Sequence, residues 1–217
     1  FTLDNWKNPC GAPEVCTALG NSIKIGLLAT IFSTILGTMI AFAIGRYAFK
    51  GRSSSNLLIF LPMATPEIVL GASLLSLFLV FHINPGFWPT VIAHVMFCIS
   101  FVVVTVKARI ASLDPRLEQA AMDLYANELE TFRRVTLPLV APGIAGAALL
   151  AFSLSFDDFI ITNFNSGTLK TFPEFVYTSA ARGIPAQANV IGSAMFILAL
   201  LIVIAGQFVG KKVKVSK

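Results

Sequence analysis

Three acidic residues lie within long apolar stretches of this sequence, where a charge needs a specific role. They are Glu67, Asp157 and Asp158. A charged aspartate at the centre of a membrane-spanning helix costs about 2.5–3.5 kcal/mol, so such residues face protein or water. Carboxylates placed there can bind a cation, and the rings of Trp88, Phe156 and Phe159 offer cation–π surface. These six residues therefore predict a pathway for a positively charged solute.

The same residues also have structural interpretations. Glu67 can hydrogen-bond to backbone groups freed by Pro62 and Pro66. The aromatic side chains can instead form a belt at the membrane surface. Both interpretations stay open beside the pathway hypothesis.

The two aspartates differ in direction if their helix is continuous. Ser155, Asp158, Thr162 and Asn165 then share one narrow face, and Asp157 points about 100° away. Asp158 is therefore the stronger candidate for the pathway, whereas Asp157 can cap or pair with a neighbouring helix. Adjacent residues so oriented cannot share a proton, which argues against an intramembrane aspartyl enzyme.

The elements that must hold these acids are membrane helices. Of 217 residues, 56% are hydrophobic and 12% charged, against roughly 45–50% and about 25% in a soluble domain. Charged residues are absent from four stretches, each long enough for a span of about 20 residues. These are Ile25–Gly45, Ile68–Val106, Val135–Phe156 and Gly183–Gly210. The composition excludes a soluble enzyme and predicts an all-α, polytopic membrane bundle.

The longest stretch is divided by a turn at Asn84-Pro85-Gly86. Five spans are then predicted: Ile23–Ile44, Leu57–Phe81, Trp88–Val106, Leu139–Asn163 and Ala186–Phe208. Residues 1–22 form an outer segment, residues 23–210 the transmembrane domain with a polar loop at 107–137, and residues 211–217 a tail.

The basic residues predict the orientation of the spans, because Lys and Arg concentrate on the cytoplasmic side. Twelve lie on one side: Arg46, Lys50, Arg52, Lys107, Arg109, Arg116, Arg133, Arg134, Lys211, Lys212, Lys214 and Lys217. The other side holds Lys7, Lys24, Lys170 and Arg182. The N-terminus is therefore expected outside and the C-terminus in the cytoplasm, and an odd number of spans predicts another span before Phe1. Basic residues confined to helix ends, without a folded basic domain, argue against nucleic-acid binding.

Cysteine and histidine residues add little chemistry. Cys10 and Cys16 lie in the outer segment, where a disulfide and two free thiols are equally compatible with the sequence. Two histidines, His82 and His94, are too few and too far apart to form a metal cluster with Cys98, so no metal site is predicted.

The polar loop contains the start and stop signals of two short amphipathic helices. Asp114-Pro115 begins the first, and Asn127 with Glu130 forms a capping pair for the second. Leu137-Pro138 is expected to end that second helix. Such a loop either docks to a cytoplasmic partner or is merely solvated, and its residues alone favour neither.

The loop resembles a family signature. Glu118–Tyr125 (EQAAMDLY) followed by VTLP at 135–138 is similar to the motif E-A-A-x3-G-x9-I-x-L-P of permease subunits of ABC importers. The motif's acid falls on Gln119 and its glycine on Tyr125, two departures that predict a weaker polar contact and a different turn. The resemblance implies contact with an ATP-hydrolysing subunit through a defined set: Glu118, Gln119, Ala120, Ala121, Tyr125, Val135, Leu137 and Pro138.

Beyond the loop, Leu61-Pro62, Pro66–Gly71 and Ser155–Phe159 resemble the spermidine/putrescine branch, on the C-component side of the permease pair. The resemblance implies a six-span permease in a bacterial cytoplasmic membrane, of which five spans are visible. It implies inward transport of polyamines by alternating access, with an ATPase dimer, a second homologous permease and an extracytoplasmic polyamine-binding protein as partners. The chain contains no GxxxxGK[ST] motif, so ATP and Mg are expected on the ATPase, with no cofactor and no catalysis on this chain.

Two alternatives belong to other classes. An ion-coupled secondary transporter of a cationic solute would use the intramembrane acids as proton or cation sites. An ABC permease for another small solute would share the loop but differ in cargo. The coupling-type loop argues against the first alternative, and the sequence does not separate putrescine from spermidine.

Overall fold

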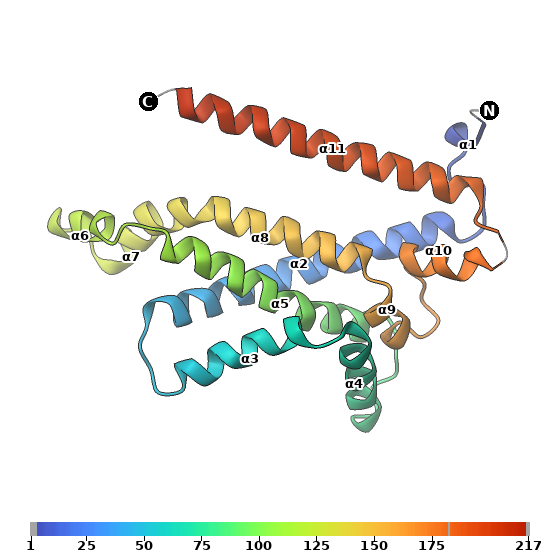
Figure 1. Ribbon diagram of the computed structural model, residues 1–217, viewed down its shortest axis with the longest axis horizontal. Helices are drawn as coiled ribbons and strands as arrows, with labels where there is room; N and C mark the ends of the chain where they lie inside the picture. The colour runs from blue at the N-terminus through green and yellow to red at the C-terminus, as the bar shows by residue number, and fades with distance from the viewer. Residues whose placement is uncertain (1–3, 182, 216–217) are drawn as a thin grey trace.

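A computed structural model describes residues 4–181 and 183–215, which fold as helices joined by short connections (Figure 1). In chain order the helices are α1 (Asp4–Lys7), α2 (Val15–Arg46), α3 (Arg52–Ala64), α4 (Glu67–Val80), α5 (Phe87–Ala111), α6 (Arg116–Asp123), α7 (Glu128–Thr131), the π-helical turn η1 (Phe132–Thr136), α8 (Leu137–Asp157), α9 (Ile160–Asn165), α10 (Phe172–Ala180) and α11 (Ala186–Val215). The predicted topology residues Arg182 and Lys217 lie outside the described residues.

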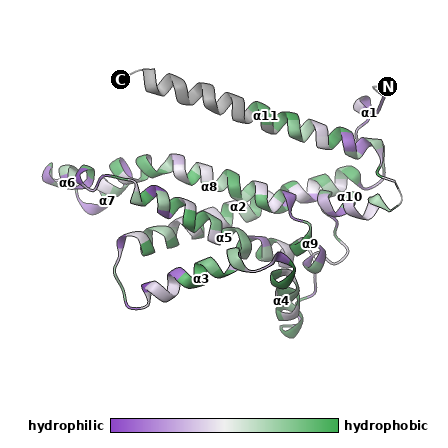
Figure 2. Ribbon diagram, viewed as in Figure 1, coloured by the Kyte–Doolittle hydropathy of each residue, from purple (hydrophilic) through white to green (hydrophobic). Residues whose placement is uncertain are grey.

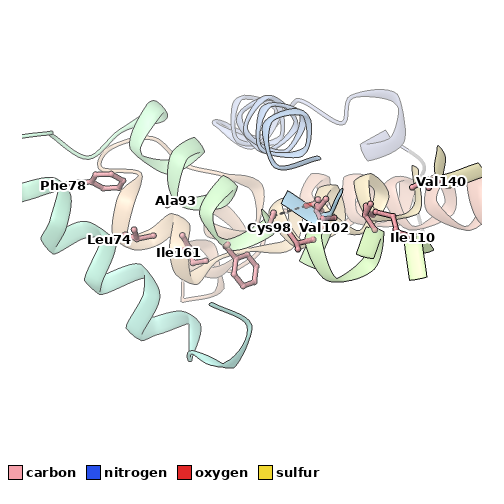
Figure 3. Close-up of a cluster of buried hydrophobic side chains, with 14 residues drawn as sticks. Leu74, Phe78, Ala93, Cys98, Val102, Ile110, Val140 and Ile161 are labelled. Atoms are coloured by element: carbon pink, nitrogen blue, oxygen red, sulfur yellow. Dashed lines mark hydrogen bonds between the residues drawn. The ribbon is translucent and has the colours of Figure 1, made fainter. Parts of the chain in front are cut away.

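Helices α2, α5 and α8 pack against one another and form the centre of the bundle. Their buried side chains include Val102 and Val106 of α5 and Val140 of α8, and Figure 3 shows this core running from Phe78 to Val140. A Cβ atom on Gly37 of α2 would lie 2.6 Å from a methyl carbon of Val102, so α2 and α5 approach closely only because this residue is glycine.

Apolar residues follow α2, α4, α5 and α8, and polar residues gather on α6 and α7 (Figure 2). Three described helices are long and apolar enough to cross a membrane: α2, α5 and the run Glu128–Asp157. The bent pair α3–α4 adds a fourth. The fifth predicted span falls on α11, of which the described apolar part is Ala186–Leu198.

Helix α2 begins before the first predicted span. Helix α2 begins at Val15 rather than at Ile23, so the expected outer segment of residues 1–22 contains the first two turns of α2. Val15 is fully buried against Phe175 of α10 and Ile191 of α11, and this apolar cluster extends the helix outward. The interactions that set this boundary come from residues far away in the sequence.

The second predicted span is not one helix. Helices α3 and α4 meet at an angle of 107°, and the break lies at Thr65-Pro66. Thr65 is extended, with φ −82° and ψ 132°, as steric conflict with a following proline requires. Glu67 therefore occupies the first turn of α4 instead of the middle of a continuous span.

The fourth predicted span is also interrupted, and its start was misplaced. Asp158 leaves the helical region with ψ 126°, so α8 ends at Asp157 and α9 begins at Ile160. The prediction that Leu137-Pro138 ends the second loop helix is wrong, because the chain continues through η1 into α8. The Leu137 amide donates to the carbonyl of Phe132, a wider π-helical bond that accommodates Pro138.

Candidate solute site and coupling loop

The two broken spans pack with their interruptions adjacent. Helix α4 lies against α9 (Figure 1), and a Cβ atom on Gly71 would come within 3.3 Å of the Ile161 Cα. Between the start of α4 and the α8–α9 break lies a cavity of about 340 Å³. Its lining residues are Glu67, Phe97, Ser153, Leu154, Asp157, Asp158, Phe159 and Ile160.

All three intramembrane acids therefore line one cavity, although Glu67 and the aspartate pair are some ninety residues apart in sequence. Glu67 and Asp157 are exposed, and neither forms a side-chain hydrogen bond or ion pair with any residue that the structure describes. Their carboxylates are free to receive a ligand. Because oxygen anions in an apolar wall favour positive charge, the cavity suits a small organic cation.

The Asp158 carboxylate is hydrogen-bonded to other groups of the protein. It is buried, and it accepts hydrogen bonds from the amides of Ile161 at 3.2 Å and Thr162 at 2.9 Å, and from the Thr162 hydroxyl at 3.1 Å. These bonds satisfy the first amides of α9. Asp158 rather than Asp157 is therefore the capping residue, because α8 ends at Asp157 and the Asp158 side chain bonds to the first amides of α9. Which aspartate meets the solute stays a prediction.

His94 of α5 holds this arrangement together. Its ring is 1% exposed, with Nδ1 2.7 Å from the Ser155 hydroxyl and Nε2 3.0 Å from the Thr162 hydroxyl. The same Nε2 lies 3.3 Å from a carboxylate oxygen of Asp158. The ring thereby connects α5 to Ser155 of α8 and to both Asp158 and Thr162 at the helix break. Sequence reasoning considered His94 only as a metal ligand and missed this role.

The three aromatic residues predicted for the pathway lie in different places. Phe159 lines the cavity and packs on Tyr177 of α10, with ring centroids 4.3 Å apart. Phe156 stacks on Phe152. Trp88 is 60% exposed beside Phe87 at the start of α5. Only Phe159 among the three is placed to contact a solute in this cavity.

At the opposite end of the bundle, α6 and α7 project beyond the other helices (Figure 1). Their apolar side chains are exposed: Leu124 by 82% and Tyr125 by 98%, together with Leu117, Met122 and Leu129. Gln119 and Ala120 are also exposed, and Ala121 is half-buried. Contiguous exposed apolar side chains mark interaction sites. The geometry therefore favours docking over a solvated connection.

Glu118 anchors this loop to the bundle. Both terminal nitrogens of Arg46, the last residue of α2, donate to its carboxylate, and the Thr136 hydroxyl before α8 donates as well. The hydrogen bond from Arg46 holds the pKa of Glu118 below its usual range. Glu118 thereby ties α6 to the last residue of α2 and to the residue that precedes α8. Val135 is half-buried in η1, whereas Leu137 and Pro138 are exposed at the start of α8.

The turn between α6 and α7 keeps the glycine-type geometry despite its tyrosine. Tyr125 has φ 64°. Its amide donates to Met122 at 2.9 Å, and the Ala126 amide donates to Ala121 at 3.2 Å, the pair of bonds of a Schellman motif. The expectation of a different turn is wrong. The left-handed conformation costs a non-glycine residue about 1–2 kcal/mol, so Tyr125 is held there against local strain.

One disulfide and one ion pair stabilise the segment that precedes α2. Cys10 and Cys16 are joined in a disulfide, with Cα atoms 5.4 Å apart. Glu14, between them, pairs with Lys170 at 2.9 Å. The disulfide closes the segment before α2 onto the first turn of that helix, and the Glu14–Lys170 pair links this segment to the one before α10. Both lie on the side of the bundle where the sequence places the exterior.

Known proteins resemble this chain along most of its length. The family described as "Binding-protein-dependent transport system inner membrane component" matches residues 22–215. The spermidine/putrescine transport system permease protein PotC of Haemophilus influenzae is 35% identical over 193 residues, covering 88% of this chain and 75% of that protein. The putrescine transport system permease protein PotI of Escherichia coli (strain K12) is 37% identical over 186 residues, covering 82% and 66%.

Solved structures share the fold. A bacterial ABC transporter that imports the acidic polysaccharide alginate contains a chain with a TM-score of 0.74 and 16% identity, covering 98% of this chain and 84% of that one. An inward-facing MetNI methionine ABC transporter matches with a TM-score of 0.73 and 14% identity, covering 89% and 93%. At these identities the likeness concerns the arrangement of helices alone.

Proposed function

The chain belongs to the family of binding-protein-dependent transport system inner membrane components, and from that premise we propose that it forms half of the membrane pathway of an ATP-driven polyamine importer. Membership makes it a multi-pass permease subunit of an ABC importer rather than an enzyme. The cargo, the orientation and the partners of this chain are the content of the proposal.

The observation that carries the cargo is the convergence of Glu67, Asp157 and Asp158 on one cavity. Two of these carboxylates are unpaired within the described chain, so they can receive two ammonium groups of one molecule. Phe159 offers a ring face beside them. Related permeases are named for spermidine and putrescine, which are flexible cations with separated ammonium groups, and the cavity chemistry agrees with that class.

Competition for uptake tests the cargo class. In cells that import through this chain, we expect unlabelled spermidine and putrescine to suppress accumulation of labelled spermidine, because both present ammonium groups to the acids. Neutral methionine at the same concentration should have no effect. Suppression by methionine equal to that by putrescine would refute an acid-based selection.

The proposed orientation and partners rest on the polar loop and on the distribution of the basic residues. We place α6 and α7 in the cytoplasm, docked to an ATPase dimer that binds ATP and Mg, and the Cys10–Cys16 disulfide outside, where an oxidising compartment preserves it. A second permease completes the pathway, and a polyamine-binding protein delivers the cargo to the outer face in a bacterial inner membrane. Closure of the ATPase would move α6 and, through Glu118, α2 and α8.

Introducing a charge into the exposed apolar face tests this coupling. Leu124→Asp should reduce ATP-dependent uptake about tenfold or more, because an unpaired carboxylate in an apolar interface is costly. The complex should still insert, since Leu124 packs little within the chain. Uptake and ATP hydrolysis are measured together in membrane vesicles. Ser53→Asp adds the same charge at an exposed position of α3 and should leave uptake intact; equal losses in the two variants would remove the loop from coupling.

A further inference from the structure

A second cavity separates α3 from α5 at the end of the bundle opposite the solute site. It has a volume of about 250 Å³. No residue of α3 is buried, although the helix lies along α5 (Figure 1). The lining is apolar except for two residues, and consists of Asn56, Ile59, Phe60, Val103, Val104, Lys107, Ala108 and Ala111. Phe60, Ala108 and Ala111 are exposed, so the gap opens to the surface and can admit an apolar chain from outside.

The polar pair lies at one end of the gap. Lys107 Nζ donates to the Asn56 side-chain oxygen at 2.6 Å, and no ion pair in the described part of the chain includes Lys107. Arg52 precedes Asn56 by one helical turn and therefore shares its face of α3. The gap thus has an apolar body and a cationic mouth.

An amphiphile with an acyl chain and an anionic headgroup matches both features. We propose that an anionic phospholipid binds between α3 and α5, with its phosphate at Lys107 and an acyl chain along Phe60 and Val104. The Lys107 amine keeps two donors beyond its bond to Asn56. Basic residues at the cytoplasmic ends of membrane helices attract anionic lipids, and the mouth lies among the residues that the sequence places in the cytoplasm.

The volume favours a lipid over a helix of a partner subunit. One turn of an α-helix is about 10 Å across and about 5.4 Å long, which exceeds the gap. A single acyl chain, which lacks the backbone of a helix, fits an apolar gap of this volume better. This inference is independent of the cargo, because the site shares no residue with the acid cavity.

Native mass spectrometry of the assembled transporter tests the site, after purification from nanodiscs with equal amounts of phosphatidylglycerol and phosphatidylcholine. We expect preferential retention of phosphatidylglycerol. Lys107→Gln should lower that retention about fivefold, the effect of one surface lysine on an anionic lipid, and Lys107→Arg should preserve it. Lys50→Gln, an equal charge change at an exposed position before α3, should retain phosphatidylglycerol as the native protein does.

A second variant tests the apolar gap separately from the charge of Lys107. Ala108→Phe fills the gap without changing charge, and should lower retention of both lipids even if Lys107→Gln fails to assemble. Equal phosphatidylglycerol in the native and Lys107→Gln transporters would overturn the proposal, and so would equal losses in Lys50→Gln. A disulfide cross-link formed between Ile59→Cys and the second permease would assign the gap to that subunit and overturn it as well.

Discussion

Replacing His94 with leucine should lower the free energy of unfolding of the assembled permease by about 1–3 kcal/mol, the cost of leaving buried polar groups without a hydrogen-bond partner. Leucine supplies comparable apolar volume but cannot donate to Asp158, whose carboxylate lies 3.3 Å from His94 Nε2. The Ser155 hydroxyl loses its hydrogen-bond partner in the same substitution. Thermal or denaturant unfolding of the purified complex measures the loss.

A double-mutant cycle separates this contact from general damage to the core. Adding Asp158→Asn to His94→Leu removes the buried charge that has lost its His94 partner and should restore part of the stability. A double variant whose destabilisation equals the sum of the two single changes would contradict the coupling between His94 and Asp158. Asp158→Asn alone should affect stability more than the concentration dependence of uptake, because this carboxylate already bonds to α9 and lies beside His94.

Neutralising the two unpaired acids of the cavity should instead impair recognition of the cargo. Glu67→Gln and Asp157→Asn should each raise the spermidine concentration for half-maximal uptake about tenfold. A hydrogen bond to a charged group contributes about 1.5–3 kcal/mol, and 1.36 kcal/mol corresponds to about tenfold. Both side chains lack partners within the described chain, so neither change should prevent assembly. Uptake is measured over a range of substrate concentrations at equal amounts of permease in the membrane.

A matched substitution outside the cavity serves as the control. Asp4→Asn removes one exposed carboxylate from α1 and should leave the concentration dependence unchanged. Unaltered uptake curves for both cavity variants would exclude Glu67 and Asp157 from the pathway. A shift of the same size in Asp4→Asn would attribute the effect to the overall charge of the outer surface instead.

Local signals predicted much of the fold. Long uncharged stretches located the apolar helices, and Asn84-Pro85-Gly86 separated α4 from α5 as expected. The capping box of Asn127 and Glu130 forms as predicted, with the Glu130 amide 2.9 Å from the Asn127 side chain. These features depend on residues within a few positions of one another, which the sequence shows directly.

The two helix breaks were missed because the local sequence is compatible with a continuous helix, and contacts with distant residues help to decide the outcome. Pro66 was visible, but prolines occur inside membrane helices, and Pro62 indeed lies within α3. The interruption at Asp158 has no proline. Its bonds to His94 and to the amides of α9 stabilise the break, and His94 is sixty-four positions away. The apolar stretches therefore predicted one continuous helix across each of the two breaks.

The same breaks explain why the candidate site was only half predicted. The residue types were recognised, since an acid in an apolar stretch is conspicuous. Their surroundings depend on the turn at Asp158, which buries that side chain in the cavity wall and leaves Asp157 exposed. On the loop, Tyr125 was expected to change the turn. The two Schellman bonds instead impose a left-handed conformation on it.

ATP-driven accumulation of labelled spermidine in proteoliposomes tests the central claim most directly. The reconstituted system contains this permease, its partner permease, the ATPase and the loaded binding protein. We predict accumulation that requires ATP and the binding protein and persists when proton and sodium gradients are dissipated. Accumulation driven by an imposed proton or sodium gradient without ATP would contradict the account and identify a secondary transporter.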